Sequence, residues 1–196
     1  MAEPVEIRSH NIFLLGKKVL LRPMTEADWD ILLKWNSDSD VLYFSEGDDV
    51  QSYSLTEIHE IYRSVSQTAF CFIAEVNGQP VGEGWLQQMN LPRILHNYPE
   101  YDCRRIDLMI GEKALWGKGI GSEIIRLLVD FAFEQEKADL VFGCGIADYN
   151  PRSLGAFQKV GFEIVDKSKQ PPGDKAHFCF DAMLSREQYF AKVANR

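Results

Sequence analysis

The chain lacks long apolar runs and an excess of positive charge. None of its hydrophobic stretches approaches the roughly 18 residues that a membrane-spanning helix needs. Lysine and arginine number 21 against 29 aspartates and glutamates, which gives a net charge of −8. This balance argues against nucleic acid and anionic membranes as partners, and it is compatible with a small, cationic substrate.

Cysteine is also scarce, and the four cysteines form no Cys-x-x-Cys pair. Three of them lie in apolar, strand-like runs, so we expect reduced core thiols in a cytoplasmic protein. No metal site is expected, because no zinc-like ligand spacing is present. The acidic first residues lack the apolar core of a signal peptide. The cysteines are Cys71, Cys103, Cys144 and Cys179.

The length of 196 residues and the apolar fraction of 45% suit one domain with a sizeable core. We therefore expect a single domain over residues 1–196, with residues 1–12 as a loosely ordered extension. Hydrophobic periodicity and turn signals predict the order of elements. They are a strand at 18–23, helices at 25–36 and 54–65, a hairpin of strands 69–76 and 80–87, a loop at 91–101, a strand at 105–110, a helix at 122–135, a strand at 140–146, a helix at 150–159 and a hairpin of strands 162–165 and 177–184.

A glycine-rich segment joins strand 105–110 to helix 122–135. Its alternate glycines, Gly117, Gly119 and Gly121, allow a tight turn and a close approach of a ligand to the backbone. The unpaired N–H groups at the start of the following helix suit a phosphate. The segment fits neither the Walker pattern nor the dinucleotide fingerprint. Alone, it is either a phosphate-binding loop or a plain connection.

A second motif downstream favours the phosphate-binding interpretation. The pattern N-x-x-S-x-x-x-F-x-K-x-G-F over residues 150–162 resembles the second signature of GNAT acetyltransferases, and the order of elements is similar to theirs. The resemblance implies an α+β (mixed α/β) fold. Its centre would be a mixed, mostly antiparallel, twisted sheet of about seven strands flanked by about four helices. It also implies acetyl-CoA as the cofactor, with its pyrophosphate on residues 116–121.

The same resemblance assigns the remaining cofactor contacts. The main chain of strand 105–110 would hold the pantetheine arm, while Trp116 would either pack or cover the adenine side. Phe157 stands where many members have a tyrosine that protonates the thiolate, and this puts that step in question. The implied cofactor-binding residues are Leu108, Met109, Ile110, Trp116, Gly117, Lys118, Gly119, Ile120, Gly121, Ser122, Asn150, Ser153, Phe157 and Lys159.

Asp107 is the candidate catalytic base. An amine attacks a thioester only in its neutral form, and a carboxylate that takes the proton typically contributes roughly 10²–10⁴-fold. Strand alternation places Asp107 on the face opposite Ile106 and Leu108, and the resemblance places it near the thioester. The alternatives are a structural ion pair with Arg104 or Arg105, and His96 as the base.

Within the GNAT family, three segments resemble aminoglycoside 6′-N-acetyltransferases, and they lie at residues 105–107, 115–121 and 150–153. An acidic segment at residues 46–49 is similar as well. The resemblance implies transfer of an acetyl group to the 6′-amine of an aminoglycoside, as in antibiotic resistance, by a monomer or homodimer. The alternatives are another amine or hydroxylamine (a siderophore precursor, a polyamine or a protein N-terminus) or a regulatory CoA-binding domain without catalysis.

The acceptor site is predicted from acidic and aromatic residues, because each ammonium group of a polyamine must be matched when it leaves water. Glu83 lies between Gly82 and Gly84, small neighbours that would open room for a substrate. The candidate acceptor residues are Trp35, Tyr43, Glu83, Asp102, Asp107 and Asp181, with Glu46, Asp48 and Asp49 as further acids.

Overall fold

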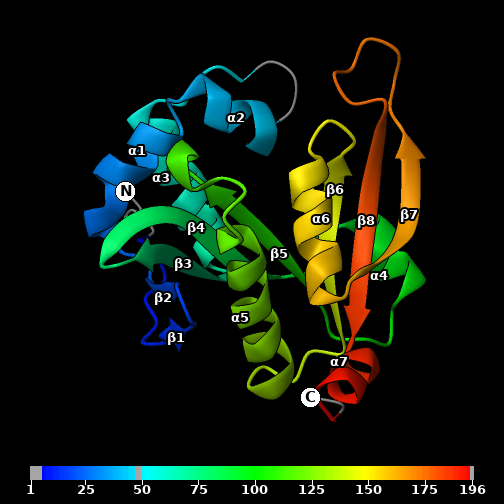
Figure 1. Cartoon of the computed structure of the whole chain (residues 1–196). Helices are drawn as coiled ribbons and strands as arrows, with labels where there is room; N and C mark the ends of the chain where they lie inside the picture. The colour runs from blue at the N-terminus through cyan, green and yellow to red at the C-terminus, as the bar shows by residue number, and fades with distance from the viewer. Residues whose placement is uncertain (1–5, 47–49, 195–196) are drawn as a thin grey trace, which may run out of the picture.

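The computed structural model describes residues 6–46 and 50–194, which form a central twisted sheet with helices on both faces (Figure 1). The sheet has eight strands in this part of the chain, in the spatial order β1-β2-β3-β4-β5-β6-β8-β7. Every neighbouring pair is antiparallel except β5 and β6. The strands are β1 Leu14–Leu15, β2 Leu20–Pro23, β3 Ala69–Val76, β4 Gln79–Gln88, β5 Cys103–Ile110, β6 Leu140–Ala147, β7 Glu163–Lys169 and β8 Phe178–Ser185.

This arrangement confirms the predicted mixed, mostly antiparallel fold class. The expected seven strands become eight because β1, only two residues long, carries too little pattern to predict. Strand β7 also continues to Lys169, beyond the predicted end at residue 165, although all of its residues are exposed. An exposed edge strand has no buried face and therefore no apolar alternation to reveal it.

Seven α-helices accompany the sheet within the described ranges, more than the four expected. The predicted loop at 91–101 is wrong in part, since Pro92 opens a helix there at the first helical position, where its missing N–H costs nothing. The helices are α1 Trp29–Trp35, α2 Ser39–Ser45, α3 Leu55–Ser66, α4 Pro92–Asn97, α5 Ile120–Glu134, α6 Pro151–Val160 and α7 Arg186–Ala194, with 3-10 turns at Glu26–Asp28 and Lys113–Leu115.

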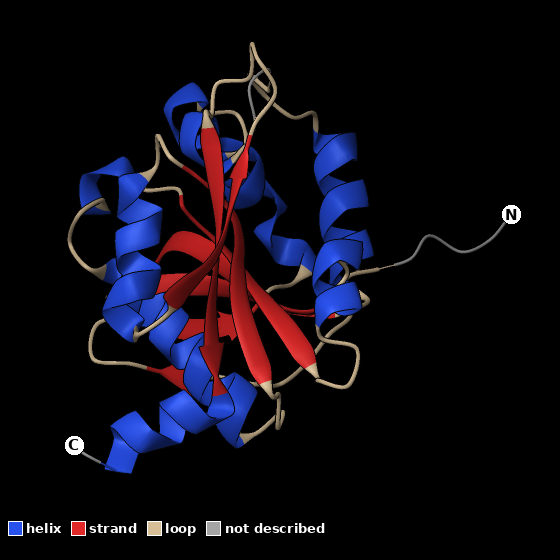
Figure 2. Ribbon diagram, turned by 90° about the vertical axis from the view of Figure 1, so that its right-hand side faces the viewer, coloured by secondary structure: helices blue, strands red, loops and turns tan. Residues whose placement is uncertain are grey.

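The helices divide between the two faces of the sheet (Figure 2). On one face α5 buries Ile124 and Leu128 against Phe72 and Ile106. On the other face α1 and α3 pack with Met109 of β5 in a second cluster. Alternate residues of β5 thus enter different cores, which leaves both sides of this strand firmly held.

The beginning of the described chain is anchored, contrary to the expected loose extension. Ile7 is buried, and its amide donates to Glu26 at 2.9 Å. The Arg8 guanidinium donates to the Ser66 carbonyl at 2.8 Å, and the His10 ring bonds the Cys71 carbonyl at 2.9 Å. The prediction is therefore wrong for this segment, while residues 1–5 lie outside the described part.

The two parallel strands at the centre diverge. Strands β5 and β6 pair only at Cys103↔Leu140, Arg104↔Val141 and Arg105↔Phe142. Beyond these pairs, β6 is bulged between Gly143 and Ile146 and keeps its bonds to β8. The outer half of β5 therefore presents a sheet edge to an opening flanked by α5 and α6, and this opening holds the candidate site.

Three further observations concern the described residues. No helix among them is long and apolar enough to cross a bilayer. They contain no group of three or more His, Cys, Asp or Glu side chains placed to hold a metal ion. All four cysteines are free thiols, of which two are buried and two partly buried.

Candidate functional site

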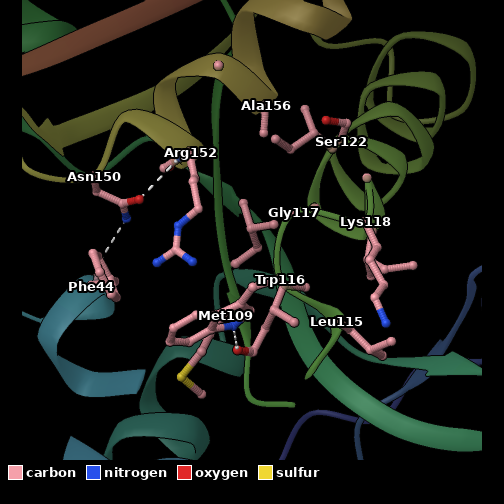
Figure 3. Close-up of a pocket in the computed structure, with 18 of the residues that line it drawn as sticks. Phe44, Met109, Leu115, Trp116, Gly117, Lys118, Ser122, Asn150, Arg152 and Ala156 are labelled. Carbon is pink, nitrogen blue, oxygen red and sulfur yellow. Dashed lines mark hydrogen bonds between the residues drawn. The ribbon is translucent and has the colours of Figure 1, made fainter. Parts of the chain in front are cut away.

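The first of two adjoining cavities lies between β5, the glycine loop, the start of α5 and α6 (Figure 3). Its volume is about 510 Å³. Every residue predicted to bind the cofactor lines this cavity except Phe157. The sequence motifs therefore converge on a single hollow, although they are separated along the chain by a helix and a strand.

The glycine loop has the geometry of an anion-binding turn. Gly117 and Gly119 have φ angles of 75° and 84°, in the left-handed region, with open space where a Cβ would stand. The first backbone bond of α5 runs from the Glu123 amide to the Gly119 carbonyl, and no side chain caps the helix. The amides of residues 120–122 thus precede that bond and lie at the cavity, together with the positive end of the helix dipole. These groups fit a pyrophosphate.

Replacing Gly119 by alanine should raise the KM for acetyl-CoA by about tenfold. A left-handed conformation costs a residue with a Cβ about 1–2 kcal/mol, so the loop would shift away from its anion-binding shape. Steady-state kinetics with varied acetyl-CoA would measure this effect.

A matched control is Gly78→Ala, because Gly78 has a φ of 73° in the β3–β4 turn, with open space around it. Both variants should lose similar stability on thermal unfolding, but Gly78→Ala should keep the wild-type KM. An equal rise of KM in both variants would show that the effect is general destabilisation.

An arginine that sequence reasoning missed closes one side of the first cavity. The Arg152 guanidinium lies 4.3 Å from the centre of the Phe44 ring and 4.4 Å from that of Trp116 (Figure 3). The Trp116 indole in turn donates to the Ile110 carbonyl at 2.7 Å. Trp116 is thus a packing residue that also forms a wall of the cavity. Helical periodicity could have revealed Arg152, since it shares a face of α6 with Ala156 and Lys159.

The second cavity, of about 300 Å³, lies on the other side of the same opening. It shares five lining residues with the first, so ligands in the two cavities would meet. Three carboxylates line it, from Glu46, Asp107 and Asp174. An acidic lining of this kind suits an ammonium group. The shared residues are Phe44, Ser45, Leu108, Asn150 and Ser153.

Asp107 lies in the wall of the second cavity, directly beside the shared residue Leu108. It also forms an ion pair with Arg105, the structural role that the sequence analysis gave as an alternative. Arg105 donates from Nε and Nη2 to the two carboxylate oxygens at 2.7 and 2.6 Å. Each oxygen of a carboxylate has about two acceptor positions, so this pairing leaves capacity for another proton donor. The two interpretations of Asp107 are therefore compatible.

Glu46 is the described member of the acidic segment at residues 46–49; Asp48 and Asp49 lie outside the described residues. Its side chain lines the second cavity and bonds Tyr53. Burial raises the pKa of the Glu46 carboxyl, an effect that the hydrogen bond from Tyr53 opposes and the neighbouring Asp107 carboxylate increases. The Asp107 carboxylate thus acts on Glu46 across the cavity.

Three predicted acceptor residues are corrected by the structure. Trp35 is 0% exposed and donates its indole N–H to Glu112, because the helical stripe on which it lies faces the core. Asp102 lines neither cavity and pairs with Arg104 at 2.7 Å. Asp181 is buried, pairs with Arg93 and accepts the Gly145 amide at 2.8 Å, so it supports the bulge in β6. None of the three lines either cavity.

Glu83 is also corrected as a direct acceptor contact. The glycines beside it open no room, because a Cβ on Gly82 would strike the β5 backbone and one on Gly84 would press on α5. Glu83 is buried and accepts hydrogen bonds from Tyr62 and Trp85. Burial raises its pKa to about 8. The flanking glycines singled out Glu83 in the sequence, but they could not show that its side chain is buried.

The remaining candidates differ in position. His96 lies on α4 and lines neither cavity. Phe157 lines the second cavity instead of the first, and its ring fills the space left by the missing side chain of Gly143. Tyr43 lines neither cavity, but its ring lies 5.5 Å from that of Tyr149, which lines the second.

Comparisons with known proteins agree with this geometry. The family model described as "Acetyltransferase (GNAT) domain" matches residues 18–163. The aminoglycoside N(6′)-acetyltransferase type 1 of Klebsiella pneumoniae is 25% identical over 189 residues, which cover 89% of this chain and 86% of that protein.

Solved structures share the fold. The structure of AAC(6′)-Ib with ribostamycin and coenzyme A has a TM-score of 0.72 at 23% identity, covering 89% of this chain and 97% of that one. Spermidine N-acetyltransferase from Vibrio cholerae with CoA and spermine has a TM-score of 0.71 at 15% identity, covering 89% and 99%.

Proposed function

This chain belongs to the GNAT acetyltransferase family, and on that premise we propose that it acetylates a primary amine of a small polycation, with the 6′-amine of an aminoglycoside as the first candidate. The observation that carries the proposal is the acidic second cavity, which adjoins the cofactor cavity through shared wall residues. A cavity with three carboxylates can match more than one ammonium group as the acceptor leaves water. The resemblance to AAC(6′) proteins supports the aminoglycoside.

In this proposal the first cavity binds acetyl-CoA and the second binds the acceptor amine. Acetyl-CoA supplies an acetyl thioester, so that a C–N bond forms to the acceptor amine as the C–S bond breaks. The amides of the glycine loop and the start of α5 would hold the pyrophosphate, and the free edge of β5 would align the pantetheine arm. Asp107 would take the amine proton, since it lies beside Leu108, one of the five residues that both cavities share. Phe157 has no proton to give, so the thiolate would leave unprotonated by that side chain.

A panel of amines tests the acceptor assignment. We expect thiol release from acetyl-CoA to be faster with kanamycin than with spermidine, butylamine or a peptide with a free N-terminus. Product analysis by mass spectrometry and NMR should place the acetyl group on the 6′-nitrogen. Faster turnover of spermidine would replace the aminoglycoside by a linear polyamine. If only the peptide were acetylated, at its N-terminus, the polycation proposal would be wrong.

A further inference from the structure

The side chain of Lys175 lies against two tyrosine rings beside the second cavity. The Lys175 ammonium is 3.3 Å from the centre of the Tyr43 ring and 4.2 Å from that of Tyr149. It also donates to the Tyr43 carbonyl. Three separate segments thus meet around one cation: the end of α2, the β6–α6 connection and the β7–β8 connection.

The Tyr43–Tyr149 pair lies at the edge of the second cavity, where we propose that the acceptor binds. Tyr149 lines that cavity, and so do Asp174 and Ala176, the two neighbours of Lys175 in sequence. The Tyr149 hydroxyl donates to the Glu46 carbonyl at 3.3 Å, which fixes the ring against α2. Aromatic faces next to carboxylates attract ammonium groups, whatever molecule carries them. The place that holds Lys175 is therefore suited to an ammonium group of an acceptor.

We propose that Lys175 is a specificity-determining residue, whose ammonium group occupies an aromatic subsite that an acceptor must take over with an ammonium group of its own. The proposal rests on the proposed acetylation of a polycationic amine. An acceptor with one amine places it near Asp107 and leaves Lys175 undisturbed. An acceptor with a second ammonium group competes with Lys175 for the two rings. The long, flexible lysine stem allows the displaced ammonium to turn into solvent.

Lys175→Met tests this role by the direction of its effect. Removing the competitor should lower the Kd of kanamycin and of spermidine about three- to tenfold in calorimetric titrations, the range expected for a cation–π contact. The Kd of butylamine should not change. Lys175→Arg, which keeps a cation, should bind all three amines as the wild type does.

Lys167→Met is a matched control. Lys167 lies on the same hairpin, 4.0 Å from the centre of the Phe178 ring, and lines neither cavity. Its loss changes the net charge equally and also removes a cation–π contact, but it should leave the three Kd values unchanged. If Lys167→Met tightens polycation binding as much as Lys175→Met, the effect is only long-range charge, and the proposal is wrong.

Two further results would overturn the proposal. If Lys175→Met binds kanamycin and spermidine as weakly as the wild type or more weakly, Lys175 merely supports its loop. If neither protein binds a polycation at all, the subsite does not exist. Turnover is a separate measurement: tighter binding by Lys175→Met without thiol release would sustain the role of Lys175 and contradict the proposed acetylation.

Discussion

Replacing Asp107 by asparagine should lower kcat by roughly 10²–10⁴-fold, the usual contribution of a positioned general base. Asparagine has nearly the same shape but cannot accept the amine proton. Binding of acetyl-CoA should stay unchanged, because Asp107 lines the second cavity and not the first. Rates of thiol release at saturating concentrations of both substrates, with calorimetric binding of acetyl-CoA, would measure the two quantities.

Arg105→Gln separates the base from the ion pair. Arg105 donates to both Asp107 oxygens, so a purely structural Asp107 would make the two variants fail together. If Asp107 is the base, Arg105→Gln should retain most of the activity while Asp107→Asn loses it. Full kcat in Asp107→Asn would remove Asp107 from the reaction. Equal losses of kcat in both variants would show that Asp107 acts only as the ion-pair partner of Arg105.

The stability of the wild-type protein should depend on pH through Glu83, and Glu83→Gln should remove that dependence. Burial raises the pKa of Glu83 to about 8 in the folded state, whereas an unfolded glutamate titrates near pH 4.5. Between these values the folded state binds a proton that the unfolded state has released. The free energy of unfolding therefore falls as pH rises, by about 1.4 kcal/mol for each pH unit. From pH 5 to pH 7 this amounts to roughly 3 kcal/mol.

Glutamine resembles the protonated carboxyl: its carbonyl oxygen can accept the Trp85 indole N–H, and its amide N–H can donate to the Tyr62 hydroxyl oxygen. Urea unfolding at a series of pH values would give the difference between the two proteins. The contributions of all other titratable groups to the free energy of unfolding cancel in that difference. One such group is His10: burial lowers its pKa, so its contribution to stability rises with pH.

Glu112→Gln is the control for this experiment. Glu112 also accepts an indole N–H, but the hydrogen bond from Lys34 lowers its pKa. Its carboxylate is therefore ionised in both states between pH 5 and pH 7, and its replacement should leave the slope unchanged. A Glu83→Gln protein with the wild-type slope would show that Glu83 is ionised in the folded protein.

The geometry of the proposed cofactor cavity was predictable from the sequence because it rests on local features of the chain. Gly117 and Gly119 adopt left-handed angles that the alternation of glycines had already indicated, and helix α5 starts directly after them. Asn150 caps α6 as expected, by accepting the Ser153 amide. Each of these features depends on residues within a few positions of one another, so a pattern can record it.

The acceptor half was not predictable in the same way. Trp35, Asp102 and Asp181 were plausible by residue type, yet burial and ion pairs turn them away from the cavities. Asp174 and Tyr149, which line the second cavity, lie in connections whose sequence carries no periodic signal. Which acids meet depends on how far β5 and β6 diverge and on where α2 lies across them.

The sequence alone determined the fold class, the glycine loop and the strand that carries Asp107, because turn geometry, helix capping and strand alternation are short-range properties. Only the tertiary structure decided that Glu83 is buried and that Lys175 lies between Tyr43 and Tyr149. Those contacts join segments up to 132 positions apart. Their electrostatics follow from burial and packing, which no local pattern of residues records.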